Sequence, residues 1–209
     1  MQYPKGRTDD YITPLYAWEQ IKQFIPVNNA LGTPTVIWEP FYCDGSSGEN
    51  LRSLGFEVIH TDEDFFQSNH GDVIVTNPPF SKKQAVLKRL KELGKPFILL
   101  MPAYVLSSVY WRETIRDEQF LLLIPPKRIE FLTRDERGVL VNAGRPSFDC
   151  FYYCVNISKS QNVLLFIWKL PHQKKNRTKL DFENRCFSKK VTWKGSNCHS
   201  ILTPDLVIT

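Results

Sequence analysis

The 209-residue sequence lacks several features that would narrow its class at once. No apolar run is long enough to cross a membrane, and the first seven residues contain no hydrophobic segment of a secretory signal. The five cysteines are odd in number, irregularly spaced and without a CxxC pair, so neither a disulfide framework nor a metal site is predicted. We therefore expect a cytoplasmic protein with reduced thiols and no membrane partner. A zinc site that includes Cys186, Cys198 and His199 is the weaker alternative.

The greater part of the chain also lacks net charge, since the formal excess of +5 falls entirely after Pro171. Eight of the 27 Lys and Arg residues lie there, against three of the 22 Asp and Glu residues, so the rest of the chain is balanced. This distribution predicts a neutral catalytic domain over residues 1–171 and a basic extension over residues 172–209 that binds a polyanion. A tail that is merely solvated is the alternative.

Strand-like and helical patterns alternate along the first 171 residues, which predicts an α/β fold on a mostly parallel sheet with an antiparallel edge. Strands are expected at 35–38, 56–60, 73–75, 96–101, 120–124, 149–155 and 163–170. Helices are expected at 14–25, 49–54, 82–93 and 107–116.

Three local details accompany this pattern. Thr13 is expected to cap the first helix through its hydroxyl. The segment 129–132 is expected to pair with the strand at 149–155. Alternation within that strand places Cys150 and Cys154 on one buried face, as core residues.

The turn after the first predicted strand is acidic and lacks the GxGxxG pattern of dinucleotide-binding proteins. It carries Glu39, Asp44, Gly45 and Gly48, and Asp62 stands after the second strand. Because Glu39 and Asp44 would repel a pyrophosphate, a cationic cofactor suits this turn better, with its ribose hydroxyls bound by Asp62. S-adenosylmethionine, with an amine, a sulfonium and a ribose, fits. The alternative is an ordinary βαβ turn with solvated acids.

The segment Asp64-Phe65-Phe66 follows Asp62 almost directly, with no room for the usual helix and strand between them. This edge of the sheet is therefore expected to be abbreviated. Asp64 could accept a hydrogen bond from an adenine amine while Phe65 packs on the ring. Both phenylalanines are equally well explained as ordinary core residues.

The strand at 73–75 runs into Asn77-Pro78-Pro79-Phe80, which we call the lip. The two prolines have no N–H, so the chain must leave a central sheet at this point, at an edge where open α/β sheets bind ligands. An exocyclic amine on a nucleobase is a poor nucleophile because its lone pair is delocalised. The side-chain oxygen of Asn77 and the carbonyl of Pro78 could accept both N–H bonds, and Phe80 could stack on the base. A Pro-Pro turn with Asn77 as a turn former is the alternative.

These residues resemble the N6-adenine methyltransferases, most closely the small single-domain type of phages and bacteria. Four stretches carry the resemblance in the family's order: YITP at 11–14, the glycine loop at 38–48, Asp62, and DVIVTNPPF at 72–80. Weaker similarity continues, so that residues 8–171 are covered. Two departures stand out: Asp44 replaces the first glycine of the usual loop, and the region of the third strand is compressed.

The resemblance implies a Rossmann-like class I S-adenosylmethionine-dependent methyltransferase fold with a seven-stranded type of sheet. The implied cofactor-binding residues are Tyr11, Thr13, Glu39, Phe41, Asp44, Gly45, Asp62, Asp64, Phe65 and Asn77. The implied catalytic residues are Asn77, Pro78, Pro79 and Phe80. Nucleic acid is expected to contact Lys82, Arg145, Lys174, Lys175, Arg177, Lys189 and Lys190.

Methylation of adenine N6 in nucleic acid is the function predicted, with DNA favoured over RNA. Protein glutamine N5-methylation is an alternative, because a glutamine amide is also a planar and poorly nucleophilic nitrogen. A non-catalytic subunit that binds cofactor or nucleic acid is the other alternative. No separate target-recognition domain is visible, so a specificity subunit or a homodimer stays open as a protein partner.

Overall fold

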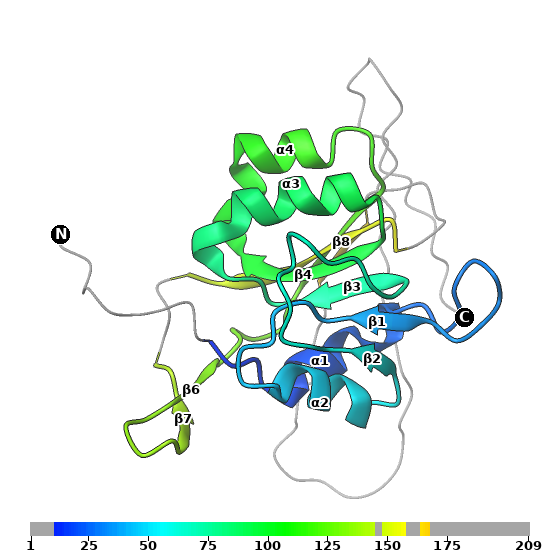
Figure 1. Cartoon of the computed structure of the whole chain (residues 1–209). Coiled ribbons are helices and arrows are strands. Elements are labelled where there is room, and N and C mark those ends of the chain that lie inside the picture. The colour runs from blue at the N-terminus through cyan, green and yellow to red at the C-terminus, as the bar shows by residue number, and fades with distance from the viewer. Residues whose placement is uncertain (1–10, 145–147, 158–163, 168–209) are drawn as a thin grey trace, which may run out of the picture.

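The structure is a computed structural model of the whole chain, and it describes residues 11–144, 148–157 and 164–167 (Figure 1). The predicted tail domain at 172–209 therefore lies outside the described residues, as do Cys186, Cys198 and His199. The described strands are β1 (Val36–Trp38), β2 (Glu57–Ile59), β3 (Val73–Thr76), β4 (Phe97–Pro102), β5 (Phe120–Ile124), β6 (Leu132–Arg134), β7 (Leu140–Asn142), β8 (Cys150–Val155) and β9 (Leu164–Ile167). The helices are α1 (Leu15–Ile21), α2 (Ser46–Ser53), α3 (Lys83–Leu93) and α4 (Val109–Thr114), with the 3-10 turns η1 (Lys22–Phe24), η2 (Phe80–Lys82) and η3 (Ala103–Ser107).

Seven strands form one sheet in the order β2-β1-β3-β4-β8-β5-β9. β8 is antiparallel to both of its neighbours, and every other neighbouring pair in the sheet is parallel. The Rossmann-like fold class predicted from the sequence is confirmed. One detail differs, because the antiparallel strand lies between β4 and β5 and is not the outermost strand.

Helices cover both faces of this sheet (Figure 1). Trp18 of α1 and Leu51 of α2 pack with Ile37 in a hydrophobic cluster on one face. Leu87 of α3 and Trp111 of α4 belong to a second cluster on the other face. β3 and β4 are buried at every position, as expected of central strands covered on both sides.

Two predicted details are wrong. The segment around residue 132 does not pair with β8, because β6 pairs with β7 in a separate hairpin that projects from the body, and β8 is already flanked by β4 and β5 (Figure 1). Thr13 does not cap α1, since Pro14 occupies the cap position with no side-chain hydrogen bond. The hydroxyl of Thr13 instead accepts a hydrogen bond from Asn77.

Other predictions at this level are confirmed. Gly94 ends α3 with a positive φ of 64° and donates its N–H to the carbonyl of Leu90. Cys150 and Cys154 are free and buried in one cluster. The connection from β2 to β3 contains neither helix nor strand, so this edge is abbreviated. Among the described helices, none has the length and apolarity needed to span a membrane.

Candidate active site at the carboxyl ends of β1 and β3

The chain order reverses between β1 and β3, since β2 lies on one side of β1 and β3 on the other. Open α/β sheets bind ligands at such a switch point, beyond the carboxyl ends of the strands. Glu39 follows β1 there and Asn77 follows β3. The hydroxyl of Thr76 donates to Oε1 of Glu39 at 2.5 Å, which holds the two strand ends together. The structure therefore brings together two site residues that the sequence could only place separately.

Glu39 is a buried carboxyl, 1% exposed, with two hydrogen-bond donors: the Thr76 hydroxyl and the N–H of Phe41, at 3.0 Å. Burial raises the pKa of Glu39 from 4.5 to about 8, although the bonds from Thr76 and Phe41 act to lower it. No described lysine or arginine forms an ion pair with it. A cation placed beside this carboxyl would favour the ionised form and would gain a partner that is not screened by water.

The amide of Asn77 has a fixed orientation. Its Nδ2 donates to the Thr13 hydroxyl at 3.0 Å and to the Tyr11 carbonyl at 3.5 Å. A carbonyl can only accept, so the nitrogen must face Tyr11 and the oxygen must face away from it. Oδ1 is buried and has no hydrogen-bond partner among the described residues. A buried acceptor left open is costly for the free protein, and it marks a place where a ligand donor would be favoured.

Phe80 lies in an aromatic cluster and does not present an open face. Its ring is 8% exposed and contacts Tyr11, Phe131 and Phe148 at centroid distances of 6.1, 6.5 and 5.4 Å. A base that stacked on Phe80 would have to displace one of these neighbours. Pro78 is buried and Pro79 half-buried, so the lip is braced from beneath by packed rings.

The glycine loop differs from expectation at Asp44. Its Oδ1 accepts from the N–H and hydroxyl of Ser46, and its Oδ2 accepts from Arg134 of β6 at 2.9 Å. Burial alone would raise the pKa of Asp44, but the bonds from Ser46 and Arg134 outweigh it and hold the pKa below its usual value. Asp44 is thus a loop cap already paired with a cation, so it offers no free charge to a cofactor.

Two glycines in this loop are required for different reasons. Gly45 has a φ of +83°, which favours glycine, and its N–H donates to the carbonyl of Tyr42. A Cβ on Gly48 would lie 2.3 Å from Cδ2 of His60, so only glycine lets that ring pack against α2. His60 is 6% exposed, and its Nδ1 lies 2.8 Å from the carbonyl of Glu39. The ring therefore supports the backbone beneath the site.

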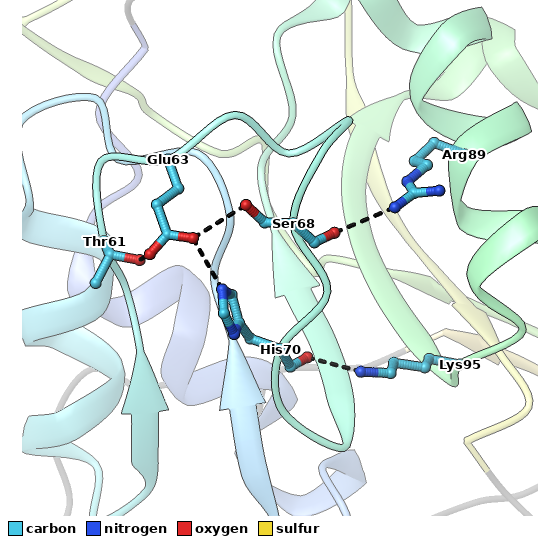
Figure 2. Close-up of polar contacts among 6 residues, drawn as sticks. All are labelled: Thr61, Glu63, Ser68, His70, Arg89 and Lys95. Atoms are coloured by element: carbon cyan, nitrogen blue, oxygen red, sulfur yellow. Dashed lines mark hydrogen bonds and ion pairs between the residues drawn. The ribbon is translucent and has the colours of Figure 1, made fainter.

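The loop that carries Asp62 and Asp64 is held by polar contacts that centre on Glu63 (Figure 2). Glu63 accepts from the Thr61 hydroxyl at 2.9 Å and the Ser68 hydroxyl at 3.0 Å, and it pairs with His70 at 2.9 Å. Two further side chains, one from α3 and one from the turn after it, donate hydrogen bonds to backbone carbonyls of this loop. Arg89 donates to the carbonyl of Ser68, and Lys95 donates to the carbonyls of His70 and Gly71.

The three predicted residues in this loop have different environments. Asp62 is exposed, and its carboxylate makes no hydrogen bond within the described part of the chain, so it is available to a ligand. One oxygen of Asp64 accepts from the N–H of Phe66 and stabilises the turn. Phe65 is 2% exposed and packs on Trp38 and Phe41, which is the core role left open above.

Several site features were missed from the sequence. Thr76 and His60 were not singled out, although Thr76 bonds Glu39 and His60 packs below it; both adjoin predicted strand ends, and that position was the available signal. Arg134 could not have been linked to Asp44, because they are 90 residues apart. Lys82 is exposed beside the lip, whereas Arg145 and the predicted basic residues from Lys174 onward lie outside the described residues.

No protein-family model matches the chain, and no curated protein matches it. Among solved structures, the chain is similar to a Listeria monocytogenes protein provisionally described as a class I S-adenosylmethionine-dependent methyltransferase. The two are 10% identical, with a TM-score of 0.41 over 77% of this chain and 66% of the other, so the chain spans slightly less than two thirds of that protein's length.

Proposed function

We propose that the protein transfers a methyl group from S-adenosylmethionine to the N6 amine of adenine in nucleic acid. The observation that carries the proposal is the open, buried Oδ1 of Asn77, whose amide is fixed by Tyr11 and Thr13. An exocyclic amine offers two N–H donors, and Oδ1 would accept one of them while the carbonyl of Pro78 accepts the other. Both bonds favour a pyramidal nitrogen with its lone pair free to react.

The environment of Glu39 supports a cationic cofactor. A buried carboxyl with a raised pKa and no described cation beside it is the partner that an ammonium or sulfonium group would favour. Asp62, exposed and without a described hydrogen bond, would accept from the ribose hydroxyls. When bound, S-adenosylmethionine would supply an electrophilic methyl group and leave as the neutral thioether S-adenosylhomocysteine, while the amine gives up one proton to solvent. The residues of this chain supply binding, orientation and the activation of the amine.

The proposal is tested by incubating the full chain with S-adenosylmethionine carrying a tritiated methyl group. Separate reactions would contain duplex DNA, single-stranded DNA, RNA, and a protein pool that includes glutamine-rich peptides. We expect label in one or more nucleic acids and none in protein. Label in protein alone would favour glutamine N5-methylation. Cofactor binding without any transfer would favour a non-catalytic subunit.

A further inference from the structure

A groove with a cavity volume of about 640 Å³ lies between α3 and α4. Its wall begins at Ser81 and Lys82 of η2, directly after Phe80 of the lip, and continues along α3 past Lys88 to Lys91. A helix rises about 1.5 Å per residue, so this wall is roughly 15 Å long. The groove therefore begins one residue after the lip and runs along the α3–α4 layer, which Figure 1 shows on one side of the sheet.

The groove is basic. Lys82, Lys88 and Lys91 are exposed along it, and Glu113 is the one acid among its lining residues. None of the three lysines forms an ion pair with a carboxylate of the described residues. Lys91 is anchored, since its Nζ donates to the carbonyl of Glu113 at 3.0 Å. A row of unneutralised lysines attracts an anion with repeated charges.

Lys83, the residue next to Lys82, makes contacts that differ from those of the three groove lysines. Lys83 does not line the groove. Its Nζ donates to the carbonyl of Phe80 at 3.0 Å and lies 5.7 Å from the centroid of the Tyr104 ring. The two adjacent lysines therefore have different roles: Lys83 stabilises the lip, and Lys82 lies at the mouth of the groove.

The remaining lining side chains suit a nucleotide better than a simple anion. Tyr110 is half-buried and contributes a ring, while Ser81 and Gln84 carry hydrogen-bonding groups. Aromatic rings beside basic residues are typical of surfaces that bind single strands without reading their sequence. The volume falls within the range of small-ligand pockets, so the groove has room for a short single-stranded segment.

We infer that this α3–α4 groove binds the sugar–phosphate backbone of an unpaired nucleic-acid strand next to the target adenine. The inference rests on the proposed function, because the lip at the mouth of the groove defines which nucleotide is the target. An adenine in an unpaired strand also enters the site without the cost of unpairing, which is a few kcal/mol in a duplex. The substrate class that follows is single-stranded or looped nucleic acid.

The test uses Lys88→Glu in the full chain. Lys88 is exposed and makes no hydrogen bond within the described part of the structure, so the change should leave the fold intact; circular dichroism checks this, and the milder Lys88→Gln should act in the same direction. The matched control is Lys22→Glu, an exposed lysine of η1 on the α1 side of the molecule. The probes are fluorescent oligonucleotides with one adenine, extended from it on the 5′ side, on the 3′ side, or not at all.

We expect Lys88→Glu to weaken binding of one extended oligonucleotide by about tenfold at low salt, and to leave the unextended probe unchanged. The slope of log affinity against log salt should fall by about 0.7 for each phosphate of a single strand that the variant no longer neutralises. Lys22→Glu should match the wild type on every probe. Equal effects of the two variants, or an equal loss for a blunt duplex, would overturn the inference.

Measuring binding and methyl transfer separately also distinguishes failure of the groove from failure of the proposed function. Binding is measured without methyl transfer, so adenine methylation with unchanged binding by Lys88→Glu defeats the groove alone. Binding through Lys88 without any methylation leaves the groove standing and defeats the proposed function.

Discussion

Two glutamates near the carboxyl edge of the sheet have opposite environments. Glu39, after β1, is buried with no described cationic partner, and burial raises its pKa to about 8. Glu63, after β2, is exposed, and bonds from His70, Thr61 and Ser68 lower its pKa. The two carboxyl groups therefore differ in what they still lack: Glu39 has no positive partner among the described residues, and Glu63 is already satisfied by its own loop.

The largest expected effect concerns Asn77, which shares the switch point with Glu39. Asn77→Ala should reduce the single-turnover rate of methyl transfer by about 10²–10³-fold, because it removes a preorganised acceptor from the reacting amine. Cofactor affinity should stay within a few-fold of the wild type. Thr13→Val, which removes one bond that orients the amide, is the companion variant and should have a smaller effect on the same rate. A wild-type rate for Asn77→Ala would mean that the lip is only the end of a strand and has no catalytic role.

The next largest effect is expected at Asp62, which stands beside Glu63 in the loop after β2. Asp62→Ala should weaken S-adenosylmethionine binding by about tenfold to a hundredfold, since a hydrogen bond to a charged group contributes about 1.5–3 kcal/mol. Calorimetry measures the affinity directly. Glu57→Ala, an exposed acid on β2, is the matched control and should bind like the wild type. Similar affinities for both variants would remove Asp62 from the cofactor site.

The raised pKa of Glu39 predicts a pH dependence of both stability and cofactor binding. Glu39 has a folded pKa of about 8 against an ordinary value of 4.5, so its contribution to stability is fully present below pH 4.5 and is lost as pH rises through 8. A cationic cofactor favours the carboxylate, so its affinity should rise between these pH values and binding should release a proton. Glu39→Gln should flatten both profiles and weaken binding by about tenfold at pH 8, following the loss of a charged hydrogen-bond partner. Thermal unfolding and calorimetry in buffers of different ionisation enthalpy give the two profiles, and profiles that match the wild type would contradict this role.

The smallest effect is expected at Glu63. Glu63→Gln keeps the shape of the side chain but removes the charge that faces His70, so cofactor affinity should fall by only a few-fold, through the position of Asp62. Because the lowered pKa of Glu63 reflects bonds to the ionised form, the effect should diminish as the pH falls and Glu63 in the wild type becomes protonated. A reduction as large as that of Asp62→Ala would mean that Glu63 binds the cofactor itself.

Local patterns predicted much of this molecule. The apolar run before Asn77 and the prolines after it correctly placed a central strand that ends at the lip, because both signals lie within a few residues. The order of strand-like and helical segments predicted the fold class, because each of these patterns can also be recognised from neighbouring residues. Gly94 was recognisable as a helix end from its position alone.

The contacts that define the site could not be read in this way. Thr76 meets Glu39 across 37 residues, and Arg134 meets Asp44 across 90, so neither partner is implied by its neighbours in sequence. Phe80 was expected to offer a face to a base, but Tyr11, Phe131 and Phe148 cover its ring. Such packing depends on which segments the sheet brings together, and a strand pattern alone does not contain that information.

The most direct test of the proposed reaction is a mass measurement on nucleosides. The full chain and Asn77→Ala would each be mixed with trideuteromethyl S-adenosylmethionine and a single-stranded oligonucleotide with one adenine, which is then digested. We expect the N6-trideuteromethylated adenine nucleoside from the wild type and almost none from Asn77→Ala, with cofactor affinities of the two proteins within a few-fold of each other. Label on another base, or equal label from both proteins, would contradict this expectation.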